Sequence, residues 1–183
     1  TLKQNDYVRA AKAVGARWYR ILVRHLLPNT LGVLIIAVFL ELPGSRLLEP
    51  GEARYAEIPR EMLETGDWVT PRVNQQPYFE KPPLLYWSNA IALRVFGEND
   101  YAARLTSRLS ALAVAVILLV ALPRAEGPLA ALIFLSSLLP FLLARQNLID
   151  GLLTAAVAAC LLSLREFARR RERGERGLTW IIA

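Results

Sequence analysis

The chain has 183 residues, of which 54% are hydrophobic, and its mean hydropathy of +0.31 is high for a soluble globular domain. The formal net charge is +6, and the basic excess lies in two blocks beside apolar runs, as on the cytoplasmic side of a membrane protein. Nucleic acid is disfavoured as a partner because no recognition motif accompanies the charge. The single cysteine, Cys160, excludes an internal disulfide and is predicted to be a small buried hydrophobe.

The N-terminal region is predicted to lead from the cytoplasm into the membrane. Residues 1–25 are basic and helix-prone, and we expect a cytoplasmic amphipathic segment on the membrane surface, bent at Gly15. Residues 26–42 form the first predicted span, with its N-terminal side cytoplasmic because lysines and arginines precede it. The chain begins with Thr1 rather than Met and ends in a new apolar stretch, so we expect truncation at both ends; no secretory signal peptide is visible.

A charged loop, residues 44–101, separates this span from the next apolar run and is predicted to lie outside. Residues 52–64 have helical character, with Pro59 opening a turn or kinking the helix and Gly66 ending it. Residues 67–71 and Pro82-Pro83 are predicted to be extended, and residues 84–96 to form an amphipathic helix. We therefore expect short amphipathic helices on the outer membrane surface.

Three further spans are predicted at residues 102–122, 129–143 and 147–164, followed by a basic cytoplasmic loop at 165–177. Arg104 and Arg108 are expected to snorkel at the outer end of the second span, and Pro140 to kink the third. The resulting fold class is an all-α integral membrane bundle of about four transmembrane helices, in a multi-pass membrane protein. A water-soluble helical bundle is the alternative, which is disfavoured because the apolar runs lack a polar face.

The loop from residue 49 to 87 interleaves acids, bases and aromatic residues beside the predicted bundle. This combination suits a phosphate-linked sugar as a substrate. Asp150 lies near the outer start of the fourth predicted span, where a carboxylate is costly and is a functional candidate. The alternative is a helix-start residue that the helix dipole favours. The predicted topology places Asp150 and the acidic loop on the same side of the membrane.

The first part of the chain resembles one family of membrane proteins. Residues 5–36 resemble the coupling segment of dipeptide/oligopeptide ABC-transporter permeases. They include the stretch DYVRAAKAVGARWYRILVRHLLPNTLGVLI. The matching positions are Tyr7, Ala10, Ala11, Gly15, Leu27, Pro28 and Asn29. This resemblance implies an ATPase subunit as a partner, docked on an exposed cytoplasmic helix.

Residues 34–183 resemble a different family, through an ordered set of motifs. These are R-Y-A-E-I at 54–58, R-E-M-L at 60–63, G-D-W at 66–68, Y-F-E-K-P-P at 78–83, L-Y-W at 85–87, F-G at 96–97 and A-R at 103–104. They resemble the GT-C membrane glycosyltransferases of the aminoarabinose-transferase and protein-mannosyltransferase-like group. Asp150 falls where that family keeps a second acid. The match covers only the N-terminal part of such an enzyme, so residues 26–183 are predicted to be a fragment of its transmembrane domain.

The second resemblance implies transfer of a sugar from a polyprenyl-phosphate donor to a lipid, glycan or protein acceptor at the outer face of the bacterial inner membrane. Arg54 and Lys81 suit the phosphate, as a planar fork and a point charge. Glu52 and Asp150 are the carboxylates expected to activate the acceptor or orient the cations. The remaining candidates are Tyr55, Tyr78 and Tyr86 as lipid or sugar contacts, and Glu80 as a ligand of a divalent metal or as a partner of Lys81. Membrane lipids and the apolar spans would surround the polyprenyl tail.

The sequence departs from this family at one position. The usual acidic pair of the loop is Asp-Glu, but here it is Gly51-Glu52. Either Glu52 and Asp150 carry the chemistry, or the acceptor geometry differs, or the chain is inactive; surface salt bridges are the structural alternative for the loop charges.

The two resemblances meet within residues 32–37. We hypothesise a fused, misassembled or mispredicted reading frame, in which the first 25 residues pack poorly against the rest. The enzyme hypothesis predicts that Arg54, Lys81, Glu52 and Asp150 converge on one outer cavity. The permease hypothesis predicts that the loop charges scatter.

Overall fold

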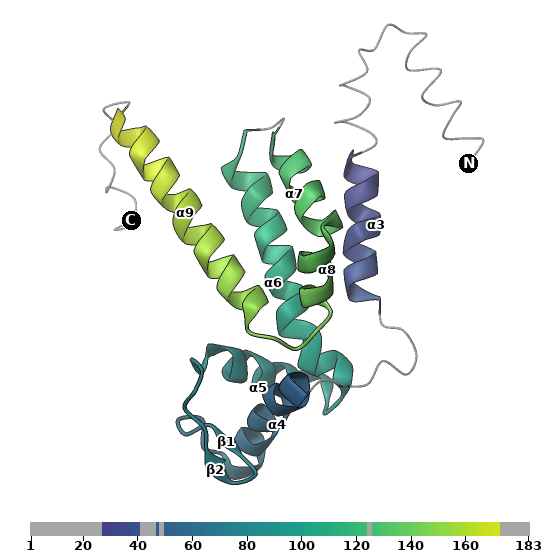
Figure 1. Ribbon diagram of the computed structural model, residues 1–183, viewed down its shortest axis with the longest axis vertical. Coiled ribbons are helices and arrows are strands. Elements are labelled where there is room, and N and C mark those ends of the chain that lie inside the picture. Colours follow the sequence, from purple (N-terminus) through teal and green to yellow (C-terminus); the bar gives the residue numbers. More distant parts are fainter. Residues whose placement is uncertain (1–26, 41–46, 48–49, 124–125, 173–183) are drawn as a thin grey trace, which may run out of the picture.

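The computed structural model describes residues 27–40, 47, 50–123 and 126–172 (Figure 1). The predictions for residues 1–25, including their poor packing and the docking helix, lie outside this range. The described elements are α3 (Leu27–Phe39), α4 (Pro50–Thr65), β1 (Arg72–Val73), β2 (Gln76–Pro77), α5 (Leu84–Phe96), α6 (Asp100–Ala121), α7 (Glu126–Ser136), α8 (Leu138–Ala144) and α9 (Asp150–Glu172). The fold is therefore mostly helical, as predicted, with one short antiparallel hairpin that the sequence analysis did not predict.

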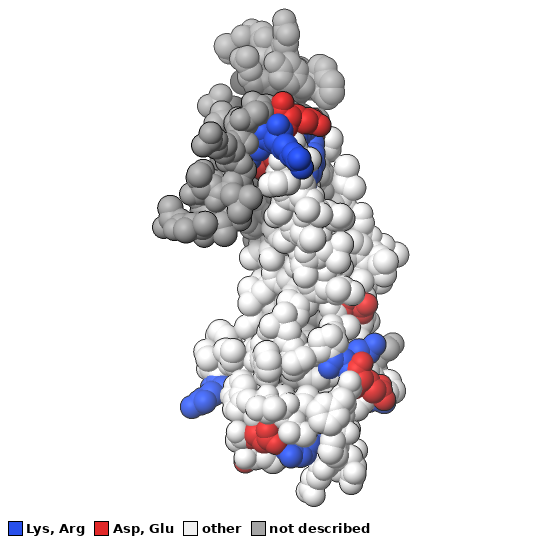
Figure 2. All heavy atoms as spheres, turned by 90° about the vertical axis from the view of Figure 1, so that its left-hand side faces the viewer, with Lys and Arg blue, Asp and Glu red and all other residues white. Residues whose placement is uncertain are grey.

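The helices form an upright bundle with a second layer across one end. Helices α3, α6, α7 and α9 run lengthwise, while α4, α5 and the hairpin lie across the end at which α9 begins (Figure 1). On the face drawn in Figure 2, charged side chains gather at the two ends of the molecule and a broad belt between them is almost free of charge. This face thus has the charge distribution of a membrane protein, and the loop forms short helices at one end of the bundle.

The described residues support fewer spans than the four that were predicted. Helices α6 and α9, with 22 and 23 residues, are long and apolar enough to cross a membrane. The pair α7 and α8 passes the same test only as one span that is bent by 70°. Helix α3 has 13 residues, about 20 Å of helix, which is shorter than the roughly 30 Å hydrocarbon core. Two or three spans are therefore supported by length and composition.

The bend between α7 and α8 lies three residues before the predicted kink at Pro140. Pro140 has no N–H to donate to the carbonyl of Ser136, and its ring crowds that carbonyl, so the helix is interrupted at Ser137. Ser137 adopts an extended conformation, with φ −69° and ψ 134°. Pro140 then occupies the first turn of α8, where a missing N–H costs little.

Helix α6 is the centre of the bundle and packs against α5, α7, α8 and α9. One core cluster joins Ala115 of α6 to Ala131 and Leu135 of α7, with side chains of α3 packed against it. By contrast, Ala155 is the one buried residue in the described length of α9. Cys160 is exposed, so the prediction that it is buried was wrong. The reason is that α9 packs on one side only, and Cys160 lies on its uncovered side.

Gly127 allows the close turn from α6 to α7, and we expect substitutions there to destabilise the fold. A Cβ at this buried position would lie 3.0 Å from the carbonyl oxygens of both Leu118 and Leu119, which are backbone atoms that cannot swing aside. Gly127→Val should therefore lower the free energy of unfolding by about 1–3 kcal/mol. Thermal unfolding in detergent measures the loss. Gly32→Val is the matched control, since a Cβ at Gly32 meets nothing within 4 Å. Equal melting temperatures for the two variants would contradict the prediction.

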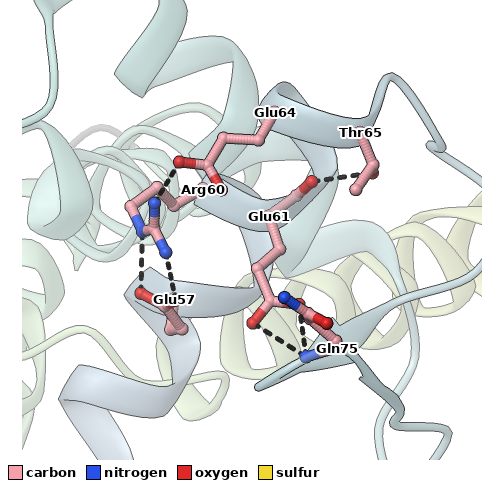
Figure 3. A network of polar contacts seen from close by, with 6 residues as sticks. All are labelled: Glu57, Arg60, Glu61, Glu64, Thr65 and Gln75. Atoms are coloured by element: carbon pink, nitrogen blue, oxygen red, sulfur yellow. Dashed lines mark hydrogen bonds and ion pairs between the residues drawn. The ribbon is translucent and has the colours of Figure 1, made fainter.

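Helix α4 and the hairpin form a connected unit. The helix continues through Pro59, so Pro59 does not open a new turn, which was one of the two outcomes predicted for it. As predicted, the helix ends at Gly66, whose φ of +70° suits glycine. Figure 3 shows the carboxylate of Glu61 accepting the backbone N–H of Gln75, at 3.1 Å, in the hairpin turn. On the neighbouring face of α4, Arg60 bridges Glu57 and Glu64 (Figure 3). Some loop charges therefore do form local ion pairs, as the structural alternative predicted.

The connection after α4 is held by Asp67. Its carboxylate accepts the backbone N–H groups of Val69 and Thr70, each at 3.0 Å, and pairs with Arg72 at 2.7 Å. The bond from Thr70, followed by those from Arg72 and Val69, lowers the pKa of Asp67 to about 2. The turn that leads into the hairpin therefore keeps its charged anchor at all physiological pH values.

Candidate functional site

The end layer brings the predicted site residues to the same end of the bundle as Asp150. A Cβ at Gly51, in the first turn of α4, would lie 3.9 Å from Leu148 in the loop before α9. Asp150 is the exposed first residue of α9 and follows that loop directly. The acid and the charged loop therefore lie at one end, which is the arrangement that the enzyme hypothesis requires.

Arg54 of α4 is held by a chain of polar contacts to the segment after the hairpin. Its Nη1 donates to the hydroxyl of Tyr78 at 3.5 Å, and its Cζ lies 5.7 Å from the centre of that ring. The Tyr78 hydroxyl donates in turn to Oε2 of Glu80 at 2.8 Å. The bond with Tyr78 is the main cause that raises the pKa of Arg54 above its ordinary value. An exposed guanidinium that is held in this way suits a phosphate ligand.

The three predicted tyrosines do come together. Tyr86 of α5 is fully buried with Ile58 and Met62 of α4, and Tyr55 and Tyr78 pack against this cluster. The ring centres of Tyr55 and Tyr86 are 6.2 Å apart. Within the described residues, the buried Tyr86 hydroxyl has no hydrogen-bond partner. Burial, and then the neighbouring Tyr78, Tyr55 and Glu80, raise the pKa of Tyr86, so this hydroxyl stays protonated and can donate.

Lys81 and Glu80 are both exposed and adjacent, but the structure does not pair them. The carboxylate of Glu80 instead accepts a hydrogen bond from the hydroxyl of Tyr78. Among the described residues, no group of three or more His, Cys, Asp or Glu side chains is placed to hold a metal ion. A metal at Glu80 therefore stays a prediction.

Glu52 is buried in an ion pair rather than exposed beside Arg54. It is 3% exposed, and its two carboxylate oxygens accept Nε and Nη2 of Arg104 at 2.9 and 3.1 Å. The prediction that Arg104 and Arg108 snorkel was wrong, because both are buried. Glu52 reaches across from α4 to satisfy Arg104, and the guanidinium of Arg108 lies 4.4 Å from the ring centre of Tyr101.

Two asparagines complete this buried network, and the sequence analysis did not find them. The backbone N–H of Asn147 donates to Oε1 of Glu52 at 2.7 Å, and its side-chain Nδ2 donates to the Glu52 carbonyl at 3.2 Å. Asn89 of α5 donates to Oδ1 of Asn147 at 2.8 Å and to the Tyr55 carbonyl at 3.3 Å. The one signal in the sequence was a lone amide on the otherwise apolar inner face of residues 84–96.

The four residues expected to converge are thus placed in different surroundings. Arg54 joins Tyr78 and Glu80, while Glu52, two residues earlier on the same helix, points into the buried network. Lys81 and Asp150 are exposed at the same end, and no hydrogen bond or ion pair joins either side chain to Arg54 in the described part of the chain. The convergence of Arg54, Lys81 and Asp150 on a single cavity stays a prediction.

The comparisons with known proteins identify a family and several relatives. Residues 80–183 match the family model described as dolichyl-phosphate-mannose-protein mannosyltransferase. The chain is 41% identical, over 157 residues, to undecaprenyl phosphate-alpha-4-amino-4-deoxy-L-arabinose arabinosyl transferase 1 of Sodalis glossinidius, covering 81% of this chain and 27% of that protein. It is 38% identical, over 141 residues, to the corresponding Serratia proteamaculans transferase, covering 71% of this chain and 25% of that protein.

A solved structure resembles the fold as well. The crystal structure of ArnT from Cupriavidus metallidurans bound to undecaprenyl phosphate superposes with a TM-score of 0.68 at 34% identity, covering 75% of this chain and 26% of that one. The chain therefore spans about a quarter of the length of the relatives it matches. These comparisons do not support the permease resemblance. The family model covers more than half of the chain, and the chain therefore belongs to the dolichyl-phosphate-mannose-protein mannosyltransferase family of GT-C membrane glycosyltransferases.

Proposed function

We propose that the chain forms the carrier-binding part of an enzyme that moves a sugar from a polyprenyl phosphate to a lipid, glycan or protein acceptor. The observation that carries this proposal is the exposed Arg54 held by Tyr78 and Glu80, with the cation Lys81 next in sequence. The relatives support this proposal, since they are named as undecaprenyl-phosphate sugar transferases.

The direction across the membrane follows from the basic end of α9. Arg169, Arg170 and Arg171 lie in the last turn of α9, at the opposite end from the layer of α4 and α5. Arginine-rich segments favour the cytoplasmic side, so the layer faces outward in this proposal. The carrier phosphate is therefore bound at the outer face of a bacterial inner membrane.

An apolar groove beside this layer suits the carrier's tail. It has a volume of about 470 Å³ and is lined by side chains of α5, α6 and α9, among them Ile91, Val95, Leu109 and Leu152. Its position next to α5 allows a lipid to keep its tail among apolar side chains while its phosphate reaches the interfacial layer. Shape and polarity thus match a polyprenyl chain ending in a charged group.

The chemistry divides between cations and a carboxylate. As the bond between the sugar's anomeric carbon and the phosphate oxygen breaks, its electron pair moves to that oxygen, and Arg54 and Lys81 stabilise the developing charge. The acceptor's nucleophilic atom forms the new bond to the anomeric carbon, and Asp150 receives its proton. Tyr55 and Tyr78 contact the sugar or the first units of the lipid, whereas Tyr86 is fully buried and supports these two side chains from the core of the layer, which revises the contact role predicted for it. Gly51 places no acid at its position, so this scheme relies on Asp150.

The test is binding of undecaprenyl phosphate to the chain in lipid nanodiscs. Arg54→Ala and Lys81→Ala should each weaken binding about tenfold or more, because each removes a charge-assisted bond worth roughly 1.5–3 kcal/mol. Arg94→Ala is the matched control, since Arg94 is an exposed arginine on α5. Binding no tighter than that of phosphatidylglycerol, or an equal loss in the control, would contradict the proposed function.

A further inference from the structure

Asn147 links the loop before α9 to the layer above it. It is fully buried, and its backbone and side chain make bonds to Glu52 of α4 and Asn89 of α5. The buried Ser107 of α6 holds the next residue, since its hydroxyl donates to the Leu148 carbonyl at 3.2 Å. The loop is thus tied to three helices within two residues. Releasing any of these bonds leaves a buried polar group without a partner, which is unfavourable.

We propose that Asn147 is a positioning residue that fixes Asp150 and the start of α9 relative to Arg54. This inference rests on the proposed function. Asn147 stands three residues before Asp150, and its partner Glu52 stands two residues before Arg54 on α4. Both connections are short and built on helix ends, so the bonds between Asn147 and Glu52 set the spacing between the acid and the phosphate-binding cation. They also set the spacing between Arg54 and the apolar groove along α9.

The role of Glu52 follows from the same geometry. A general base must come within hydrogen-bond reach of the proton it removes. Both oxygens of Glu52 are already engaged by Arg104, one of them also by Asn147, and the residue is 3% exposed. Glu52 is therefore a second positioning residue rather than the base, which revises the role predicted from the sequence. Of the two predicted carboxylates, Asp150 is the exposed one.

The experiment measures the spacing and the binding in the same variants. Spin labels are placed at the exposed positions Ala53 of α4 and Leu153 of α9, in a background with the exposed Cys160 replaced by serine. Asn147→Ala should broaden the label-to-label distance distribution and weaken undecaprenyl phosphate binding about tenfold. Gln146→Ala is the matched control, because this neighbouring amide makes no side-chain hydrogen bond within the described part of the chain. It should change neither property.

A double variant separates positioning from stability. Glu52→Leu with Arg104→Met replaces a buried ion pair by apolar side chains, which usually leaves stability unchanged or improved. It also removes the acceptor for the buried Asn147 N–H, a loss that the gain from the apolar replacement offsets. The double variant should therefore melt close to the wild type, yet show the broadened spacing and weaker binding. A wild-type distance distribution in Asn147→Ala, or unchanged binding with altered spacing, overturns the inference. If the wild type itself fails to bind undecaprenyl phosphate, the proposed function falls, while the spacing still decides whether Asn147 fixes the loop.

Discussion

Arg104→Met, made alone, is expected to lower the free energy of unfolding by about 3–5 kcal/mol, because removing one partner of a buried ion pair leaves the other charge uncompensated. The variant leaves the carboxylate of Glu52 buried without its cation, and only 3% of Glu52 is exposed to solvent. The neighbouring Asn147 N–H, at 2.7 Å, cannot compensate for a full charge. Thermal unfolding in detergent, followed by circular dichroism, measures the loss.

The matched control is Arg94→Met, an identical substitution at an exposed arginine of α5. It should change the melting temperature little, because exposed charges contribute about 0–1 kcal/mol. Similar losses in the two variants would show that the pair of Glu52 and Arg104 is not the anchor of the layer. Recovery of the melting temperature when Glu52→Leu is added would confirm that the loss comes from the uncompensated carboxylate.

Much of the fold is encoded in local sequence patterns, and those parts were predicted. The helix at residues 84–96 was placed with its observed bounds, because its apolar periodicity lies between Pro83 and Gly97. Gly66 was identified as the end of α4, since glycine adopts a positive φ at little cost. The composition of the apolar runs likewise sufficed to predict a helical membrane protein. Each of these features depends on residues close together in the chain.

The parts that failed depend on partners far apart in the chain. Nothing near Arg104 reveals that its partner is Glu52, 52 positions away, so snorkelling was the expected outcome for an arginine at a helix end. A carboxylate such as Glu52 can act as a general base or form a buried ion pair, and the sequence does not distinguish these two roles. The burial of the side chain does distinguish them, and burial is known only from the structure. The contact of Asn147 with Asn89 spans 58 positions and involves uncharged side chains, which leave no charge pattern to follow. Arg54 and Tyr78 are 24 positions apart and lie in two separate motifs, so the family resemblance, and not a local pattern, singled them out.

Asp150→Asn is expected to lower the turnover of the whole enzyme by about 10²–10⁴-fold, the range that a positioned general base contributes. The substitution keeps the shape of the side chain but removes its ability to accept a proton at neutral pH. Undecaprenyl phosphate should bind as before, because Arg54 and Lys81 are unchanged. Sugar transfer from undecaprenyl phosphate-α-4-amino-4-deoxy-L-arabinose, the donor named for the relatives, is the assay, with turnover and KM determined separately.

The helix-start alternative for Asp150 predicts a different result. An acid in the first turn of α9 stabilises the helix by only about 0.3–1 kcal/mol through the helix dipole, so its loss would shift the melting temperature slightly and leave turnover intact. Glu98→Gln is the control, because it removes one negative charge from an exposed acid in the turn between α5 and α6, at the same end of the bundle as Asp150. A large fall in turnover for Asp150→Asn alone, at constant KM, assigns proton acceptance to Asp150. Turnover equal to that of Glu98→Gln assigns Asp150 to the helix start, and the search for the base would then move outside the residues described here.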